Sequence, residues 1–177
     1  VLFEANPGEF ILKVNNVGRF FIENGKINTI EKSIDSTDDE VRLFLLGSSM
    51  GALLYQRGLI PIHGSAINTG KFSAIFSGIS GAGKSTIASA FLKKGYKLVT
   101  DDVCVVDKLD EKPFIRAGYP QLKLWKDILT KFNNEDIKKR KLRPSIEKYG
   151  IPITNNFNDE KSEVKIIFIL STKTTKG

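Results

Sequence analysis

The 177 residues, 41% of them hydrophobic, are enough for one folded domain with at most a small additional unit, and for a buried core without disulfides. The one cysteine, Cys104, has no intrachain partner and lies in an apolar run, which predicts a core thiol in a reducing cytosol. The sequence predicts no membrane span and no signal segment, and its net charge of +7 is not interleaved with aromatic residues, which disfavours a nucleic-acid partner.

The first part of the chain predicts a small β-meander. Residues 10–27 contain short apolar runs separated by Asn15-Asn16 and Asn24-Gly25. Because Asn-Gly between apolar runs favours a tight hairpin, we expect two or three short strands here. We assign residues 1–35 to an N-terminal β-meander and residues 36–177 to the main domain.

A helix is predicted to follow. Thr37 and Glu40 have the spacing of a capping box, and Gly58 is a suitable end. Mid-helix small residues such as Gly47 indicate close packing or a bend, and we expect Tyr55 to face outward. The predicted apolar face consists of Leu43, Leu46, Met50, Leu53 and Leu54.

Two apolar runs then predict a pair of antiparallel strands. Residues 59–68 and 72–77 are separated by a short turn at 68–71, and strands joined so tightly pair antiparallel. An ordinary P-loop domain instead surrounds this strand with parallel neighbours and helical crossovers. The expected sheet is therefore mixed.

The second of these strands ends in the pattern G-x-x-x-x-G-K-[ST], and a helix is predicted over residues 84–94. Glycines allow backbone N–H groups to line one concavity, and the helix adds its positive dipole end there. Lys84 supplies charge for the β- and γ-phosphates, and the Ser85 hydroxyl can ligate Mg²⁺. The alternative is a Gly-rich turn without a ligand. The predicted phosphate-binding residues are Gly78, Ser80, Gly81, Ala82, Gly83, Lys84, Ser85 and Thr86.

Two carboxylates and one histidine complete the candidate chemistry. Asp101 and Asp102 follow an apolar strand, and a β-segment continues over residues 103–107. Paired acids beside a P-loop can hold Mg²⁺ and accept a hydroxyl proton, although a solvated acidic turn is the plain alternative. His63 is the single histidine, and most lone histidines have no catalytic role. Its strand nevertheless allows it to reach the phosphate end of the sheet.

The last third of the chain is less regular. We expect residues 116–125 to be irregular and then helical, residues 125–132 to form a helix, and residues 133–149 to form a charged loop. The basic run within that loop is either a solvated face or a site where Arg140 or Arg143 meets a phosphate or an acidic substrate. Trp125 and Tyr119 could stack on a base, but core packing is favoured.

The final apolar run, residues 164–170, predicts a buried strand. Since this strand comes so close to the last residue, we expect further elements of the sheet to be missing from the chain. The main domain is therefore expected to be incomplete at its C-terminal end.

Four segments, read in order, resemble the catalytic domain of HPr kinase/phosphorylase and its smaller kinase relatives. They are the segments beginning at His63, Gly78, Lys94 and Tyr119, with the sequences HGSA, GISGAGKST, KGYKLVTDD and YPQLKLWK. Among those relatives, the chain looks most like the kinases found with lasso-peptide biosynthesis, which phosphorylate the C-terminal serine of a precursor peptide.

The resemblance implies the α/β P-loop fold, with a mixed sheet, that HPr kinases share with phosphoenolpyruvate carboxykinases. It also implies a cytoplasmic serine kinase that uses ATP and Mg²⁺, with a peptide or protein acceptor and a homo-oligomeric assembly. By position, Asp101 matches the general base, Asp102 an acid near the metal, and His63 the histidine beside the phosphates. Lys84 and Ser85 match the phosphate and Mg²⁺ ligands.

Two departures from the family pattern favour a kinase without phosphorylase activity. Thr86 stands where HPr kinases typically have Glu, and the long C-terminal signature associated with phosphorylase activity is not visible. The open alternatives are a bifunctional HPr kinase/phosphorylase and a nucleotide-binding regulatory module without transfer activity. A nucleic-acid binder would rest on the net charge alone.

Overall fold

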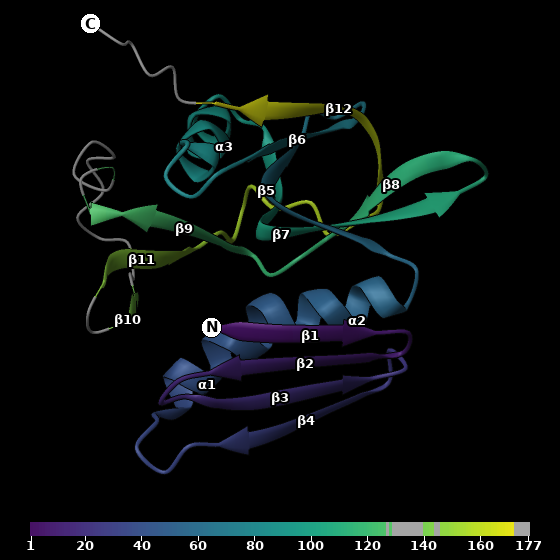
Figure 1. Ribbon diagram of the computed structural model, residues 1–177. Helices are drawn as coiled ribbons and strands as arrows, with labels where there is room; N and C mark the ends of the chain where they lie inside the picture. Colours follow the sequence, from purple (N-terminus) through teal and green to yellow (C-terminus); the bar gives the residue numbers. More distant parts are fainter. Residues whose placement is uncertain (127, 129–139, 144–145, 172–177) are drawn as a thin grey trace, which may run out of the picture. The chain divides into compact units, whose positions relative to one another are not determined.

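The computed structural model describes residues 1–126, 128, 140–143 and 146–171, and Figure 1 shows its helices and strands. The chain divides into two compact units, Val1–Pro61 and a second unit that begins at Ile62. Among the described residues, no helix combines the length and the apolar composition that crossing a membrane requires.

The first unit contains an antiparallel sheet with the strand order β1, β2, β3, β4. The strand bounds are Leu2–Asn6, Glu9–Val14, Gly18–Glu23 and Ile27–Lys32. This confirms the predicted meander and adds β1, which the sequence left undefined. At the turn before β4, Asn24 and Gly25 have φ of 50° and 64°, the left-handed region that Asn and Gly tolerate best.

One continuous helical segment follows, built from α1 (Asp38–Phe44), a π-helical segment η1 (Leu45–Ser49) and α2 (Met50–Gln56). The capping box is confirmed: the Glu40 N–H donates to Thr37 Oγ1 (3.3 Å), and the Thr37 N–H donates to Glu40 Oε2 (2.9 Å). Figure 1 shows the helical segment beside the sheet.

The predicted apolar face of this helix is partly wrong. Leu43 and Leu46 are 37% and 63% exposed, whereas Phe44 and Leu45 pack against the buried residues of the sheet, such as Phe20. The wider π turn changes the side of the helix that faces the sheet between α1 and α2. A stripe drawn at constant α-helical spacing through Met50 and Leu53 therefore misses Phe44 and Leu45. Met50 packs on the core and Tyr55 is exposed, as predicted.

Packing on the meander places the helix in the first unit. Leu53 of α2 is buried in one cluster with Leu12, Phe20 and Ile22 of the sheet. The chain therefore divides after Pro61, not after residue 35 as the sequence suggested. The sequence put the boundary where the strands end and could not show that the helix covers the same core.

The second unit is organised around a barrel with the strand order β12, β6, β5, β7, β8. The corresponding bounds are Ser162–Leu170, Ser73–Gly78, Ile60–Asn68, Lys97–Leu109 and Lys112–Arg116. As predicted from the turn, β5 and β6 pair antiparallel, with Asn68 opposite Ser73. β12 pairs with the other edge of β6 in parallel, so the sheet is mixed.

Helix α3 (Lys84–Lys93) packs against β6 and β7. The rings of Phe76 and Phe91 stack with centroids 5.5 Å apart, and Leu98 is fully buried in the same cluster. Cys104 lies in the core cluster that contains Ile75, where burial raises the pKa of its thiol. The core thiol is thus confirmed.

Three further strands form a separate sheet, in the order β10 (Arg140–Arg143), β11 (Ile146–Pro152), β9 (Gln121–Trp125). The expectation that residues 116–125 become helical, and that 133–149 form a loop, is therefore wrong in these strands. In β9, Leu122 and Leu124 are 2% and 1% exposed, so alternate side chains of the strand point into the core. The helix predicted at 125–132 falls mostly outside the described residues.

The predicted strand at 164–170 exists, but most of its apolar side chains are not buried. Ile169 is 73% exposed and Phe168 is 44% exposed, although Phe168 stacks on Phe76 at 5.4 Å. Beyond Glu163, β12 pairs only with β6 among the described residues, which leaves its other edge uncovered.

Candidate active site

The loop between β6 and α3 has the strand–loop–helix context that the motif predicted. Gly81 and Gly83 have φ of 84° and 93°, and α3 begins at Lys84 directly after Gly83. These left-handed positions allow consecutive N–H groups to face one concavity at a helix N-terminus, the arrangement that suits a phosphate. The strand, the glycine-rich loop and the helix therefore follow one another in the predicted order.

Gly78, the first glycine of the motif, has an additional reason to lack a side chain. Its φ is 147°, and a Cβ there would lie 2.5 Å from the backbone oxygen of Leu170 on β12. The parallel pairing of β6 with β12 brings these backbones together. This glycine therefore serves both the loop and the sheet.

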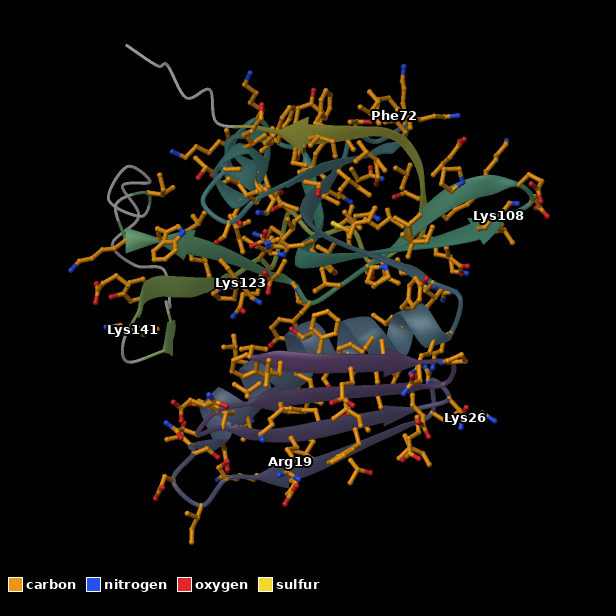
Figure 2. All side chains as sticks on the ribbon, in the orientation of Figure 1. Arg19, Lys26, Phe72, Lys108, Lys123 and Lys141 are labelled. Atoms are coloured by element: carbon orange, nitrogen blue, oxygen red, sulfur yellow. The ribbon has the colours of Figure 1, made fainter. Side chains whose placement is uncertain are left out.

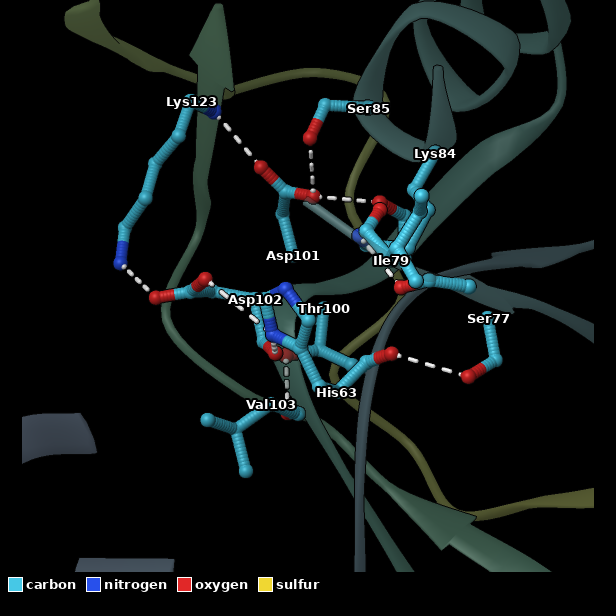
Figure 3. Close-up of polar contacts among 12 residues, drawn as sticks. His63, Ser77, Ile79, Lys84, Ser85, Thr100, Asp101, Asp102, Val103 and Lys123 are labelled. Atoms are coloured by element: carbon cyan, nitrogen blue, oxygen red, sulfur yellow. Dashed lines mark hydrogen bonds and ion pairs between the residues drawn. The ribbon is translucent and has the colours of Figure 1, made fainter. Parts of the chain in front are cut away.

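Lys84 is largely buried, and its ammonium lies over the start of the loop. Its Nζ donates to the backbone oxygens of Gly78 (2.9 Å) and Ile79 (2.8 Å), as Figure 3 shows. These carbonyls fix the ammonium at the mouth of the loop. Phosphate oxygens bind an ammonium more strongly than carbonyls do, so a bound phosphate would compete with these two carbonyls for Lys84.

Asp101 lies on β7 and receives hydrogen bonds from three other elements (Figure 3). Its Oδ1 accepts from Ser65 Oγ of β5 (2.5 Å) and from Ser85 Oγ of α3 (2.9 Å). Its Oδ2 accepts from the backbone N–H of Lys123 on β9 (2.7 Å). Asp101 is thus oriented by the surrounding fold and lies directly beside the predicted Mg²⁺ ligand Ser85.

Asp102 lies toward His63 and Lys123. Its backbone oxygen is 2.9 Å from His63 Nδ1, its Oδ1 is 3.6 Å from the same nitrogen, and its Oδ2 is 2.6 Å from Lys123 Nζ. Asp102 has a φ of 87°, which is rare for a residue with a side chain and is concentrated at functional sites. The two adjacent acids therefore face different partners.

One pocket is lined by predicted site residues from three separate segments of the chain, although Gly78 and Ala82 are not among them. His63, the loop residues Ser80, Gly81 and Gly83, the first turn of α3 and both acids line it. Lys123, Trp125 and Ile128 line it as well. Core packing of the aromatic residues, which the sequence favoured, is wrong: Trp125 is 44% exposed at this pocket, and Tyr119 is 76% exposed.

The donors in this pocket fit Mg²⁺ held jointly by protein and phosphate. Mg²⁺ prefers oxygen ligands and binds through one or two carboxylates together with substrate phosphates. Ser85 Oγ and the Asp101 carboxylate, 2.9 Å apart, and the neighbouring carboxylate of Asp102 are all oxygen donors. Within the described residues, no group of three or more His, Cys, Asp or Glu side chains could hold a metal alone.

The sequence missed Ser65 and Lys123. Ser65 follows His63 by two residues on β5, so strand alternation could have placed both on one face. The contact of Lys123 could not be inferred because its segment was interpreted as a helix.

The tentative substrate residues Arg140 and Arg143 lie on β10, but their side chains are outside the part of the chain that the structure describes. Near them, Glu147 pairs with Lys141 (2.7 Å) and Lys126 (3.2 Å). Hydrogen bonds from these two lysines lower the pKa of Glu147 to about 2. An acidic substrate would have to compete with this carboxylate for both ammonium groups.

No protein-family model matches this chain. Two curated proteins match over 56 residues, each at 36% identity and covering 32% of the chain. They are a putative HPr kinase/phosphorylase 2 from Oceanobacillus iheyensis and an HPr kinase/phosphorylase from Chlorobium phaeobacteroides. Over this stretch, the chain is similar to HPr kinase/phosphorylases. The matched stretch spans only 18% and 16% of the length of these relatives.

A solved structure described as the Hpr(Ser) kinase/phosphatase from Coxiella burnetii aligns with 66% of this chain and 62% of its own. The TM-score is 0.45 and the sequence identity is 16%.

Proposed function

We propose that this chain is an ATP- and Mg²⁺-dependent serine kinase. The observation that carries the proposal is the hydrogen bond between Ser85 at the start of α3 and Asp101 of β7, which joins a predicted phosphate-site residue to a predicted catalytic acid. The local similarity to HPr kinase/phosphorylases supports the same reaction class. A nucleotide sensor would need the loop but would have no use for a general base.

In the proposed reaction, the loop amides and Lys84 bind the β- and γ-phosphates. Asp101 removes the proton from the acceptor serine, whose oxygen attacks the γ-phosphorus while the bond to the β-phosphate oxygen breaks and ADP leaves. Mg²⁺, held by Ser85 and Asp102, would neutralise charge on the phosphates. His63, which contacts Asp102, would lie beside the transferred group.

The proposed fold is the P-loop fold that HPr kinases share with phosphoenolpyruvate carboxykinases. The antiparallel partner of the loop strand supports this assignment, because β5 contributes His63 to the pocket and a hydrogen bond from Ser65 to Asp101. We further propose that the protein acts in the cytoplasm and forms homo-oligomers, as the resemblance implies.

For the acceptor, we propose the C-terminal serine of a lasso-peptide precursor. The resemblance of the segment beginning at Tyr119 to the lasso-associated kinases supports it, and part of that segment forms β9 at the pocket. We propose Arg140 and Arg143 as residues that would contact an acidic acceptor. Bifunctional HPr kinase/phosphorylase is the second candidate, favoured by the names of the two curated relatives.

Incubating the protein with γ-labelled ATP, Mg²⁺, a set of serine-ended peptides and HPr tests this proposal. We expect label on a serine-ended peptide, none on the same peptide ending in alanine, and no transfer with EDTA present. Label on HPr, together with phosphate-dependent dephosphorylation of phospho-HPr, would favour the second candidate. Nucleotide binding without transfer to any acceptor would identify a regulatory module and contradict the kinase proposal.

A further inference from the structure

Lys123 contacts both acids of the candidate site through two different groups. Its backbone N–H donates to Asp101 Oδ2 (2.7 Å), and its Nζ donates to Asp102 Oδ2 (2.6 Å). Figure 3 shows the side chain extending from beside Asp101 to Asp102. A substitution of Lys123 therefore removes the contact with Asp102 and leaves the contact with Asp101 in place.

The position of Lys123 is set by the strand that carries it. Its neighbours Leu122 and Leu124 are buried, and Lys123 is paired with Gly150 of β11. Just before β9, the Gly118 N–H donates to the backbone oxygen of Val99 on β7 (2.9 Å). The ammonium thus starts from a backbone that packing and hydrogen bonds hold against β7.

The charges explain what such an ammonium would do. Asp101 and Asp102 are consecutive acids lining a pocket that also contains Lys84 and the loop amides. Carboxylates repel a polyphosphate, and this repulsion is less well screened when they are partly buried. The side chains of Lys123 and Asp102 are only 25% and 29% exposed, so their pairing offsets part of that repulsion.

We propose that Lys123 is a charge-balancing and positioning residue of the nucleotide site. Its ammonium holds Asp102 on the β9 side of the pocket and reduces the repulsion between Asp102 and the phosphates of a nucleoside triphosphate. The inference rests on the proposed nucleotide site and deepens it, since neither the P-loop motif nor the family pattern assigned a role to this lysine.

Fluorescence titration with mant-ATP in EDTA tests this proposal, because no metal then bridges Asp102 and the phosphates. We expect Lys123→Met to weaken affinity roughly three- to tenfold, and Lys123→Arg to bind nearly as the wild type does. Adding Asp102→Asn to Lys123→Met should restore affinity to within about twofold of the wild type, because the carboxylate that lost its lysine partner is gone.

The matched control is Lys108→Met, which also removes an ammonium that pairs with a carboxylate at 2.6 Å, that of Glu111. Figure 2 shows Lys108 at the far end of the β7–β8 hairpin from Lys123. We expect its affinity to equal that of the wild type. Thermal melting shows whether each variant is folded. Lys123→Gln is measured beside Lys123→Met, so that the result does not depend on one variant being folded.

Wild-type affinity in Lys123→Met and Lys123→Gln would overturn the inference, and so would a weakened affinity that Asp102→Asn does not restore. If the wild type binds no mant-ATP with or without Mg²⁺, the nucleotide site and this inference fail together. If the charge coupling is present but no phosphoryl transfer occurs, the inference stands and the kinase proposal fails.

Discussion

Replacing Lys84 with methionine should weaken binding of Mg·ATP by about 10- to 100-fold and abolish detectable phosphoryl transfer. Methionine retains a stem of similar length in a largely buried position, so the change removes mainly the charge. In the wild type, the ammonium that donates to the backbone oxygens of Gly78 and Ile79 would contact the phosphates when nucleotide binds. Titration with mant-ATP in the presence of Mg²⁺ measures the affinity.

Lys71→Met is the matched control, because Lys71 is an exposed lysine in the turn between β5 and β6. We expect it to bind nucleotide as the wild type does, which separates loss of a specific ammonium from loss of one net charge. Equal affinities in the Lys84→Met variant and the wild type, with both folded, would mean that this loop does not bind phosphate.

The second large effect is expected for Asp101→Asn. The variant should bind Mg·ATP within a few-fold of wild type, but its transfer rate should fall by about 10²- to 10⁴-fold, the contribution of a general base. Asparagine keeps an oxygen for the hydroxyls of Ser65 and Ser85, although its amide group cannot accept the Lys123 N–H. Single-turnover transfer at saturating ATP and Mg²⁺ measures the loss.

Two further substitutions make this test specific. Asp107→Asn removes another carboxylate of β7, one whose pKa is lowered by a hydrogen bond from Arg116, and should leave transfer unchanged. Asp102→Asn should raise the Mg²⁺ concentration needed for half-maximal transfer. If Asp102→Asn abolishes transfer at saturating Mg²⁺ while Asp101→Asn changes only the Mg²⁺ requirement, the two acids have the opposite roles.

The sequence predicted those parts of the fold that depend on neighbouring residues. The capping box at Thr37 and Glu40 and the antiparallel β5–β6 pair are local patterns, and both occur as expected. No such local pattern marks the π-helical segment at Leu45–Ser49, which changes the residues that pack on the sheet. The apolar face of that helix was consequently misassigned.

The segment at β9 shows why the site was predicted incompletely. Five residues of alternating character can also be interpreted as the start of a helix, and the pairing with β11 and the burial of Leu122 and Leu124 identify a strand. With the strand missed, the contacts of Lys123 with both acids could not be anticipated. The sequence motifs predicted the residues that would bind a phosphate. The residues that orient the acids, Ser65 and Lys123, are brought there by tertiary packing and are not part of a motif.

A crystal structure of the protein with Mg²⁺ and a non-hydrolysable ATP analogue tests the central claim most directly. We predict that the β- and γ-phosphates contact the loop amides and Lys84 Nζ, with Mg²⁺ on Ser85 Oγ and the γ-phosphate facing Asp101 and Asp102. A triphosphate bound elsewhere, or carboxylates turned away from the γ-phosphate of a nucleotide in the loop, would contradict it.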